Sequence, residues 1–250
     1  MTDLATNPDR HTVLAGRLRG PRRPTLLVGV PGWAGRALAR MRRLFWLKAL
    51  GMTLFMSIFF GLYFHLLRHP LHPPVTMPLT ALDTWLGYQP WAVWPYLSLW
   101  VYLGLAPMLM QQVRDLSVYV LWNTVLCATG LLIFLFWPSA VPVFDHAAAP
   151  GWIHSVLRGV DAAGNACPSL HVATALFCGW RTHALLRELG VPGVLRVVQL
   201  AWLALIIFST LAIKQHVWWD VLAGAVLAAA VAGVAWRAGV TRQPPRYSAG

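Results

Sequence analysis

The stretch Ser209-Thr-Leu-Ala-Ile-Lys-Gln-His-Val-Trp-Trp-Asp220 joins two long apolar segments and interrupts them with three ionisable side chains. His216 and Asp220 are four residues apart, so a helix that begins near Asp220 lets its carboxylate reach back toward the imidazole. A carboxylate that holds one ring nitrogen leaves the other free for proton transfer or nucleophilic attack. We therefore predict that this stretch joins two membrane helices and forms half of a functional site.

The second half of the predicted site is Cys167-Pro-Ser-Leu-His171, which also opens a long apolar segment. Pro168 suits the first turn of a helix, so the backbone N–H groups after it are expected to be unpaired. Such groups lie at the positive end of the helix dipole and bind phosphate well. Ser169 adds a hydroxyl donor, and an imidazole from each stretch can serve as nucleophile or acid.

Composition indicates an all-α polytopic membrane protein, a bundle of six transmembrane helices. Hydrophobic residues make up 58% of the chain and charged residues only 11%. Several uncharged runs reach about 20 residues, which a bilayer requires and a soluble core does not. A soluble protein with buried helices is disfavoured, because polar stripes at helical spacing are almost absent. The expected spans are 44–67, 91–110, 117–137, 168–186, 197–213 and 217–236.

Three regions are predicted: a basic tail over 1–43, the six-span domain over 44–236, and a short tail over 237–250. The apolar run Leu26–Val30 is too short for a secretory signal, so no cleaved signal is expected. The net charge of +12 comes largely from basic residues before residue 50. Beside a membrane span, such a tail indicates orientation and contact with lipid headgroups rather than nucleic-acid binding.

The positions of Arg and Lys predict the orientation. Cytoplasmic termini place most basic residues on the cytoplasmic side and leave Arg68, Arg158 and Lys214 outside. Both histidine stretches then lie at the outer face, although the orientation was derived from Arg and Lys and not from the histidines. The expected location is a multi-pass inner membrane protein with a periplasmic site. The three cysteines show no disulfide or metal pattern, and the histidines of the outer loops lack metal-ligand spacing, so no metal is expected.

The patterns Pro-Ser-x-His at 168–171 and Ser-x6-His-x3-Asp at 209–220 resemble the second and third motifs of the type 2 phosphatidic acid phosphatase family. The resemblance implies a six-span bundle and metal-independent phosphoester chemistry through a phosphohistidine, with no cofactor. By motif position, His216 resembles the nucleophile, Asp220 its orienting carboxylate, His171 the general acid and Ser169 a phosphate ligand. The resemblance to the family covers the last third of the chain strongly, and the rest of the chain agrees in span count only.

The chain departs from the family pattern at three places. The first motif, a Lys followed by Arg-Pro, is absent before Pro168, since Arg23-Pro24 lies in the basic tail. The Arg of the third motif is Thr210 here, and the Gly of the second is Leu170. Positive charge for a phosphate must then come from elsewhere. The predicted substrate-binding set is Ser169, Ser209, Lys214 and Arg158.

Several functions remain open. Pro-Ser-Leu-His and the Ser-Thr start of the third motif resemble the branch that contains inositol phosphorylceramide synthases, which implies transfer of a headgroup to a hydroxyl rather than to water. Fewer arginines would suit a diester donor that carries less charge. A non-catalytic lipid binder or scrambling protein is a further alternative. An intramembrane serine protease using Ser169 with His216 is disfavoured by the bulky neighbours of that serine. The expected partner is a phospholipid or another lipid phosphate in the membrane.

Overall fold

The computed structural model describes residues 32–144 and 164–237. The chain divides into two units, Met1–Pro31 and Gly32–Gly250, and all described residues belong to the second. Arg158, most of the basic N-terminal tail and the C-terminal segment after 237 therefore lie outside the described residues.

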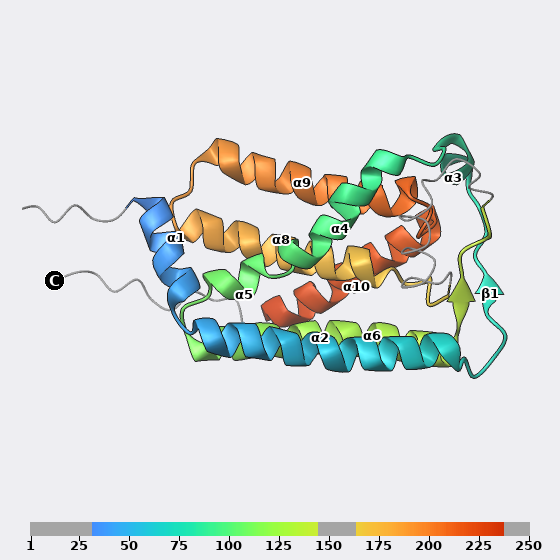
Figure 1. Cartoon of the computed structure of the whole chain (residues 1–250), viewed down its shortest axis with the longest axis horizontal. Helices are drawn as coiled ribbons and strands as arrows, with labels where there is room; N and C mark the ends of the chain where they lie inside the picture. Colours follow the sequence, from blue (N-terminus) through green and yellow to red (C-terminus); the bar gives the residue numbers. More distant parts are fainter. Residues whose placement is uncertain (1–31, 145–163, 238–250) are drawn as a thin grey trace, which may run out of the picture. The chain divides into compact units, whose positions relative to one another are not determined.

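The described part is mainly helical (Figure 1). Two short strands, β1 (Val75–Thr76) and β2 (Ser139–Ala140), pair in parallel and join two loops. The helices are α1 (Trp33–Arg42), α2 (Phe45–Arg68), α3 (Ala81–Trp85), the 3-10 turn η1 (Pro90–Ala92), α4 (Val93–Tyr102), α5 (Leu105–Leu109), α6 (Val113–Phe136), α8 (Leu170–Glu188), α9 (Gly193–Ala212) and α10 (Trp218–Arg237).

Four described helices are long and apolar enough to cross a membrane: α2, α6, α9 and α10. They correspond to the first, third, fifth and sixth predicted spans, although α6 and α9 each begin four residues earlier than predicted. The protein is therefore a mainly helical membrane protein with four candidate spans.

The second predicted span, 91–110, is not one continuous helix. It consists of η1, α4 and α5, with a break at Leu103 and Gly104. Pro107 has no N–H to donate to the carbonyl of Leu103, and glycine favours helix only weakly, which explains the break. The missing hydrogen bond at Pro107 and the low helix propensity of Gly104 outweigh the apolar pattern that predicted one continuous helix.

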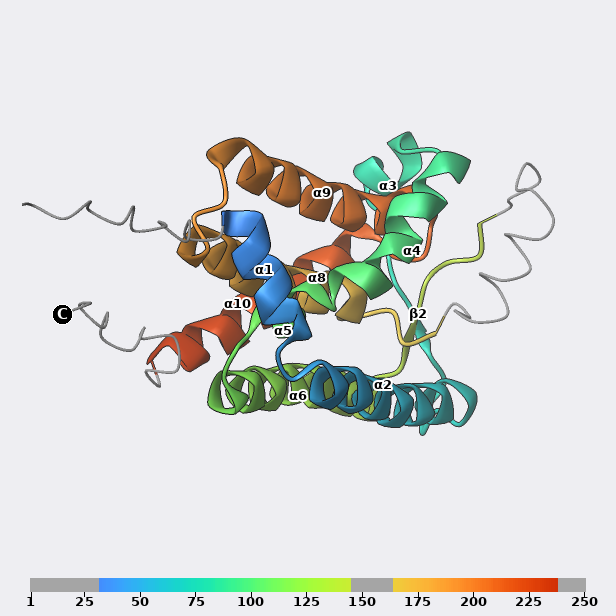
Figure 2. The same ribbon diagram turned by 60° about the vertical axis from the view of Figure 1, so that its left-hand side comes forward.

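The fourth predicted span forms α8, which lies at the centre of the helical packing. It contacts α4, α5, α6, α9 and α10, and Figures 1 and 2 both show it between α9 and α6. Because neighbouring helices cover it, α8 accommodates polar side chains such as Thr174 and Thr182, both buried. These threonines, together with charged residues such as Arg181 and Arg187, explain why α8 is not among the four helices that are long and apolar enough to cross a membrane.

Glycines allow α8 to approach its neighbours closely. A Cβ at Gly224 of α10 would meet the Ser169 carbonyl group well inside van der Waals contact, and a Cβ at Gly130 of α6 would meet Leu170. Small residues let helix backbones pack at short range inside a membrane. The start of α8 is thereby held against both α6 and α10.

We expect Gly224→Ala to destabilise the protein by about 1–3 kcal/mol, because the added methyl group has no room beside a backbone carbonyl. Thermal unfolding in detergent measures this change. Gly233→Ala is the matched control on the same helix, since a Cβ there meets nothing within 4 Å. An equal response of the two variants would contradict the close-packing explanation.

The β1–β2 pair connects the loops after α2 and α6 to the start of α8. Ser139 of β2 is fully buried, and its hydroxyl accepts a hydrogen bond from the Cys167 N–H at 2.8 Å. Its carbonyl accepts another from the Ala166 N–H at 3.1 Å. These bonds fix the chain immediately before the Pro-Ser-Leu-His motif.

Candidate active site

The two histidines of the sequence motifs meet in the structure. His171 is the second residue of α8, and His216 lies in the turn between α9 and α10. Nδ1 of His171 is 3.3 Å from Nε2 of His216, and the rings meet edge to face. The sequence predicted this proximity from charge placement and motif spacing alone.

Asp220 lies in the first turn of α10, as the four-residue spacing predicted. Its Oδ2 is 3.5 Å from Nδ1 of His216 and accepts a hydrogen bond from the Val217 N–H at 3.0 Å. The carboxylate is fully buried. A buried carboxylate on this side favours the tautomer with the proton on Nδ1, which leaves the Nε2 lone pair directed toward His171.

The two motifs are also tied through the backbone. The Ser169 N–H donates to the Asp220 carbonyl at 3.0 Å, so the start of α8 is bonded to the first turn of α10. Pro168 precedes the capping residue of α8 and does not occupy its first turn, which corrects the predicted position. The Ser169 amide, predicted to be unpaired, is therefore engaged by the neighbouring helix.

Tyr96 of α4 is a site residue that the sequence analysis did not find. Its hydroxyl is 2.9 Å from Nε2 of His171, and the two rings lie 5.0 Å apart. Trp100, one turn further along α4, meets the same imidazole edge-on. His171 thus has a tyrosine at one ring nitrogen and His216 at the other. A single hydroxyl within an apolar run offered no periodic signal that would have identified it.

Each predicted substrate-binding serine forms a hydrogen bond with a backbone group three residues away in the chain. The Ser169 hydroxyl oxygen caps α8 by accepting from the Val172 N–H at 3.3 Å. The Ser209 hydroxyl donates to the Ile206 carbonyl at 2.6 Å, and both serines are fully buried. His216 pairs with His171 and Asp220 and not with Ser169, which weighs against the serine protease alternative.

Lys214 follows the C-cap residue of α9 and has a left-handed conformation, with φ of 60°. The Gln215 N–H bonds to the Thr210 carbonyl, and the Lys214 N–H to the Leu211 carbonyl, each at 3.1 Å. These are the two bonds of a Schellman motif, in which glycine is usual at the left-handed position. The same turn bonds the His216 N–H to the Thr210 carbonyl, so the helix ending positions His216 directly.

The Lys214 ammonium group is bonded inside the protein. It donates to the carbonyl of Asp83 at 2.7 Å and to that of Leu86, and it lies 5.2 Å from the centre of the Phe144 ring. Burial lowers the pKa of this amine, and the Asp83 carboxylate partly opposes the change. These contacts favour a positioning role for Lys214 over the predicted contact with phosphate.

Asp83 in the short helix α3 connects the loop between α2 and α4 to the turn that carries His216. Its Oδ1 accepts from the Trp218 N–H at 2.9 Å, at the first residue of α10. Its Oδ2 accepts from the Thr80 backbone N–H and hydroxyl at 2.8 and 2.7 Å. The Thr-x-x-Asp spacing is a capping-box signal, which would have predicted α3 but not the contact with α10.

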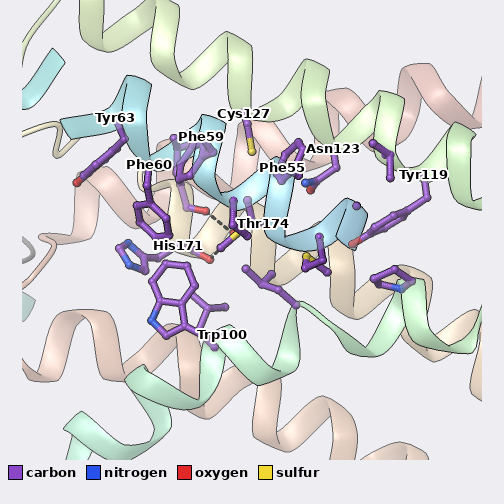
Figure 3. Close-up of a pocket in the computed structure, with 18 of the residues that line it drawn as sticks. Phe55, Phe59, Phe60, Tyr63, Trp100, Tyr119, Asn123, Cys127, His171 and Thr174 are labelled. Carbon is purple, nitrogen blue, oxygen red and sulfur yellow. Dashed lines mark hydrogen bonds between the residues drawn. The ribbon is translucent and has the colours of Figure 1, made fainter. Parts of the chain in front are cut away.

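A narrow groove leads away from the histidines (Figure 3). It has a volume of about 160 Å³ and is lined by α2 from Leu47 to Tyr63, by α4 and α5, by α6 from Leu116 to Cys127, and by the start of α8. His171 and His216 both line it. Figure 3 shows Phe60, Trp100 and Tyr63 near His171, with Asn123 and Tyr119 further along. We call this cavity the groove.

Comparison with protein families gives one match, which spans residues 71–234 and is described as the PAP2 superfamily. The chain belongs to the PAP2 superfamily. Both histidine motifs lie inside the matched range, whereas α1 and α2 precede it. Searches among curated proteins and among solved structures found no match.

Members of the PAP2 superfamily are phosphatases and phosphotransferases that act on phosphorylated lipids, and the four apolar helices fit this setting. A pair of imidazoles with a carboxylate behind one of them can perform both steps that phosphoryl transfer needs. One ring attacks the phosphorus, and the other protonates the departing oxygen. Among the described residues, no group of three or more His, Cys, Asp or Glu side chains is arranged to hold a metal ion.

Proposed function

We propose that the protein is an integral membrane lipid phosphatase or phosphotransferase that works through a phosphohistidine on His216. The observation that carries this proposal is the 3.3 Å approach of His216 Nε2 to His171 Nδ1, with Asp220 behind His216. Membership in the PAP2 superfamily supports the same reaction class. The residues that meet are those that carry the two sequence motifs.

The proposed reaction has two steps. Nε2 of His216 attacks the phosphorus, so that an N–P bond forms while the bond from phosphorus to the lipid oxygen breaks. His171 gives a proton to the departing oxygen. Water or a hydroxyl group then gives its proton to His171 and attacks the phosphorus, and the N–P bond breaks with its electron pair returning to Nε2. Asp220 stabilises the positive charge on His216 while the phosphohistidine exists.

Tyr96 supports the proton transfers of His171. Its hydroxyl lies at Nε2, the nitrogen on the far side of the ring from His216. A hydrogen bond there orients the imidazole, in the way that a carboxylate orients a catalytic histidine. Tyr96 is therefore proposed as a positioning residue for the general acid.

Phosphate binding is proposed to rely on fewer cations than the family motif supplies. At the start of α8, the Ser169 and Val172 amides are engaged, and the Leu170 amide between them is a candidate for a phosphoryl oxygen. Arg158 stays a candidate, although it lies outside the described residues. A diester donor, with less charge than a monoester, would need fewer cations. The absence of the family's arginines, with Thr210 in place of one of them, favours headgroup transfer of the inositol phosphorylceramide synthase type.

The missing first motif favours a second candidate function, a lipid-binding or scrambling protein that retains the pocket without turnover. Its distinguishing property is independence from His216, because no phosphoryl bond is broken. Lipid movement in vesicles would then survive the loss of that imidazole, whereas a phosphotransferase would lose its activity.

We further propose that the bundle crosses the membrane six times, with α8 and the broken α4–α5 rod as the two additional crossings. Arg40 of α1 forms an ion pair with Glu188 at the end of α8, at 2.9 Å, and the positive-inside rule assigns this basic end to the cytoplasm. The histidines lie at the other end of α8 and thus at the outer face. In a bacterial cell this would be the periplasmic face of the inner membrane.

The deciding experiment compares two assays on the purified protein in vesicles. One measures release of inorganic phosphate from phosphatidate, and the other measures transfer of a labelled headgroup from phosphatidylinositol to a lipid hydroxyl. Phosphate release supports a phosphatase, and headgroup transfer supports the synthase-type reaction. Lipid scrambling that His216→Ala leaves intact, with no phosphate label on His216 from any lipid phosphate donor, would reject the catalytic proposal.

A further inference from the structure

The groove is much longer than a phosphate group requires. Its α2 wall extends from Leu47 to Tyr63, which at 1.5 Å per residue is about 24 Å. One leaflet of a bilayer supplies about 15 Å of hydrocarbon, half of a core about 30 Å thick. The groove therefore runs along most of the helix and past the depth of a single leaflet.

The walls of the groove are almost entirely apolar. Phe55, Phe59 and Phe60 of α2 line it together with Trp100 of α4, and the Phe60 and Trp100 rings are in contact near His171 (Figure 3). The lining follows one side of α2 along this length, which suits an extended hydrocarbon chain better than a compact headgroup. Such a surface also suits hydrocarbon better than a peptide backbone or a sugar.

Polar contacts lie at the end of the groove far from the histidines. Lys48 lines this end, and its ammonium donates to the carbonyls of Arg40 at 2.8 Å and Met108 at 2.9 Å. These bonds tie α2 to α1 and α5. The charge of Lys48 is thus held by protein carbonyls, and the groove ends there as a floor rather than as a second anion site.

The opposite end of the groove opens on the reacting groups, because His171 and His216 line it. A ligand with a phosphoryl group at the histidines would therefore lay its tail along the aromatic walls. The α2 wall precedes residue 71 and lies outside the range matched to the family. The length and floor of the groove are features of this chain beyond the shared motifs.

We propose that the groove holds the single long hydrocarbon chain of a phosphorylated lipid in extended form, and that its floor at Lys48 sets the longest chain accepted. This inference rests on the proposed function, because it assigns the phosphoryl end of that lipid to His216. The substrate class is a monoalkyl or polyisoprenoid phosphate rather than a lipid with two chains of one-leaflet length.

Two glycines of α2 provide a matched test. A Cβ at Gly51 or at Gly61 meets nothing within 4 Å, but only Gly51 lines the groove. Gly51 is 12 residues from Tyr63, so a phenylalanine there would block the groove at about 18 Å from its histidine end. Gly61→Phe places the same side chain on the same helix outside the groove.

The assay measures kcat/KM for n-decyl phosphate and n-eicosyl phosphate with full-length protein in vesicles. We expect Gly51→Phe to lower kcat/KM for the eicosyl substrate by about tenfold or more, since several methylene groups lose their burial, and to leave the decyl substrate unchanged. Gly61→Phe should leave both unchanged. Equal effects of the two variants, or equal loss of both substrates, would overturn the proposal.

A binding experiment separates the groove from the catalytic proposal. The His216→Ala variant is irradiated with an eicosyl phosphate that carries a diazirine at the chain terminus, and the adducts are located by mass spectrometry. We expect adducts on groove residues near this part of α2, such as Met52 and Phe55, which disappear in the variant that also carries Gly51→Phe. Such adducts without turnover in the wild-type protein would reject the proposed reaction but retain the lipid site.

Two results of the same labelling would overturn the groove as a phospholipid site. Adducts only on outward-facing residues of the bundle would show that the chain stays in the surrounding membrane. Equal competition by n-eicosanol and n-eicosyl phosphate would show that ordinary hydrocarbon fills the groove without recognition of the phosphoryl end.

Discussion

Replacing His216 with alanine is expected to lower phosphoryl transfer by at least about a thousandfold, because the variant has no nucleophile. Nε2 of His216 is the nitrogen directed at His171, while Nδ1 faces the buried Asp220. The measurement is turnover of the lipid substrate, with labelling of the protein by a phosphate-labelled donor. His72→Ala, an exposed histidine of the outer loop, is the control and should retain full turnover.

Replacing His171 with alanine tests its proposed role as the general acid. With a lipid substrate, His171→Ala should turn over poorly, because the departing alkoxide receives no proton. With p-nitrophenyl phosphate the leaving group is stable without a proton, so the first step proceeds and the labelled phosphohistidine accumulates. A His216→Ala variant that retains turnover, or a label found on another residue, would contradict the assignment of the nucleophile.

The geometry around His216 was predictable because it depends on local spacing. His216 lies in the turn just before α10, which begins at Trp218, and the four-residue spacing brings Asp220 of the first turn close to its imidazole. His171 was predicted to share their membrane face from the distribution of arginines. In the structure, the start of α8 bonds to the first turn of α10 through Ser169 and Asp220, a contact that no spacing rule contains.

Residue type and spacing along the chain did not predict the hydrogen-bond partners of the proposed phosphate-binding residues. Ser169, Ser209 and Lys214 were selected by type and by nearness in the chain, but each has a hydrogen-bond partner within the protein. The partners come from α8, α9 and α3, and the contact between Lys214 and Asp83 joins residues that are 131 positions apart. Tyr96 and Asp83 were missed for the same reason.

Two of the six predicted spans are not among the four candidate spans of the structure, and the physical reason is visible at each of them. Hydropathy treats each segment as if lipid surrounded it, but α8 is covered by five neighbouring helices and tolerates polar residues. The α4–α5 rod reads as one apolar run, although Gly104 and Pro107 interrupt its backbone bonding. Composition predicts membrane insertion well and predicts the continuity of a helix poorly.

Removing the Asp83 carboxylate is expected to lower kcat by about 100-fold while the substrate KM changes little. Asp83 touches neither histidine, but its Oδ1 holds the Trp218 N–H at the start of α10. Its loss leaves a buried donor without a partner and frees the turn that carries His216. A shift of about 1 Å in a reacting group costs about this factor in rate. The measurement is steady-state kinetics of Asp83→Ala, with the rate of phosphohistidine formation as the direct readout.

Three further variants distinguish positioning from simple loss of folding. Thr80→Ala removes the local cap of α3 but keeps the bond between Asp83 and Trp218, so it should retain most of kcat. Lys214→Gly keeps the left-handed turn and removes the ammonium, so it should resemble Asp83→Ala in kcat without added backbone strain. Asp83→Asn retains an oxygen for the Trp218 N–H and should recover part of the rate. If Thr80→Ala lost as much kcat as Asp83→Ala, the effect would belong to the stability of α3, and the idea that Asp83 positions His216 through α10 would be wrong.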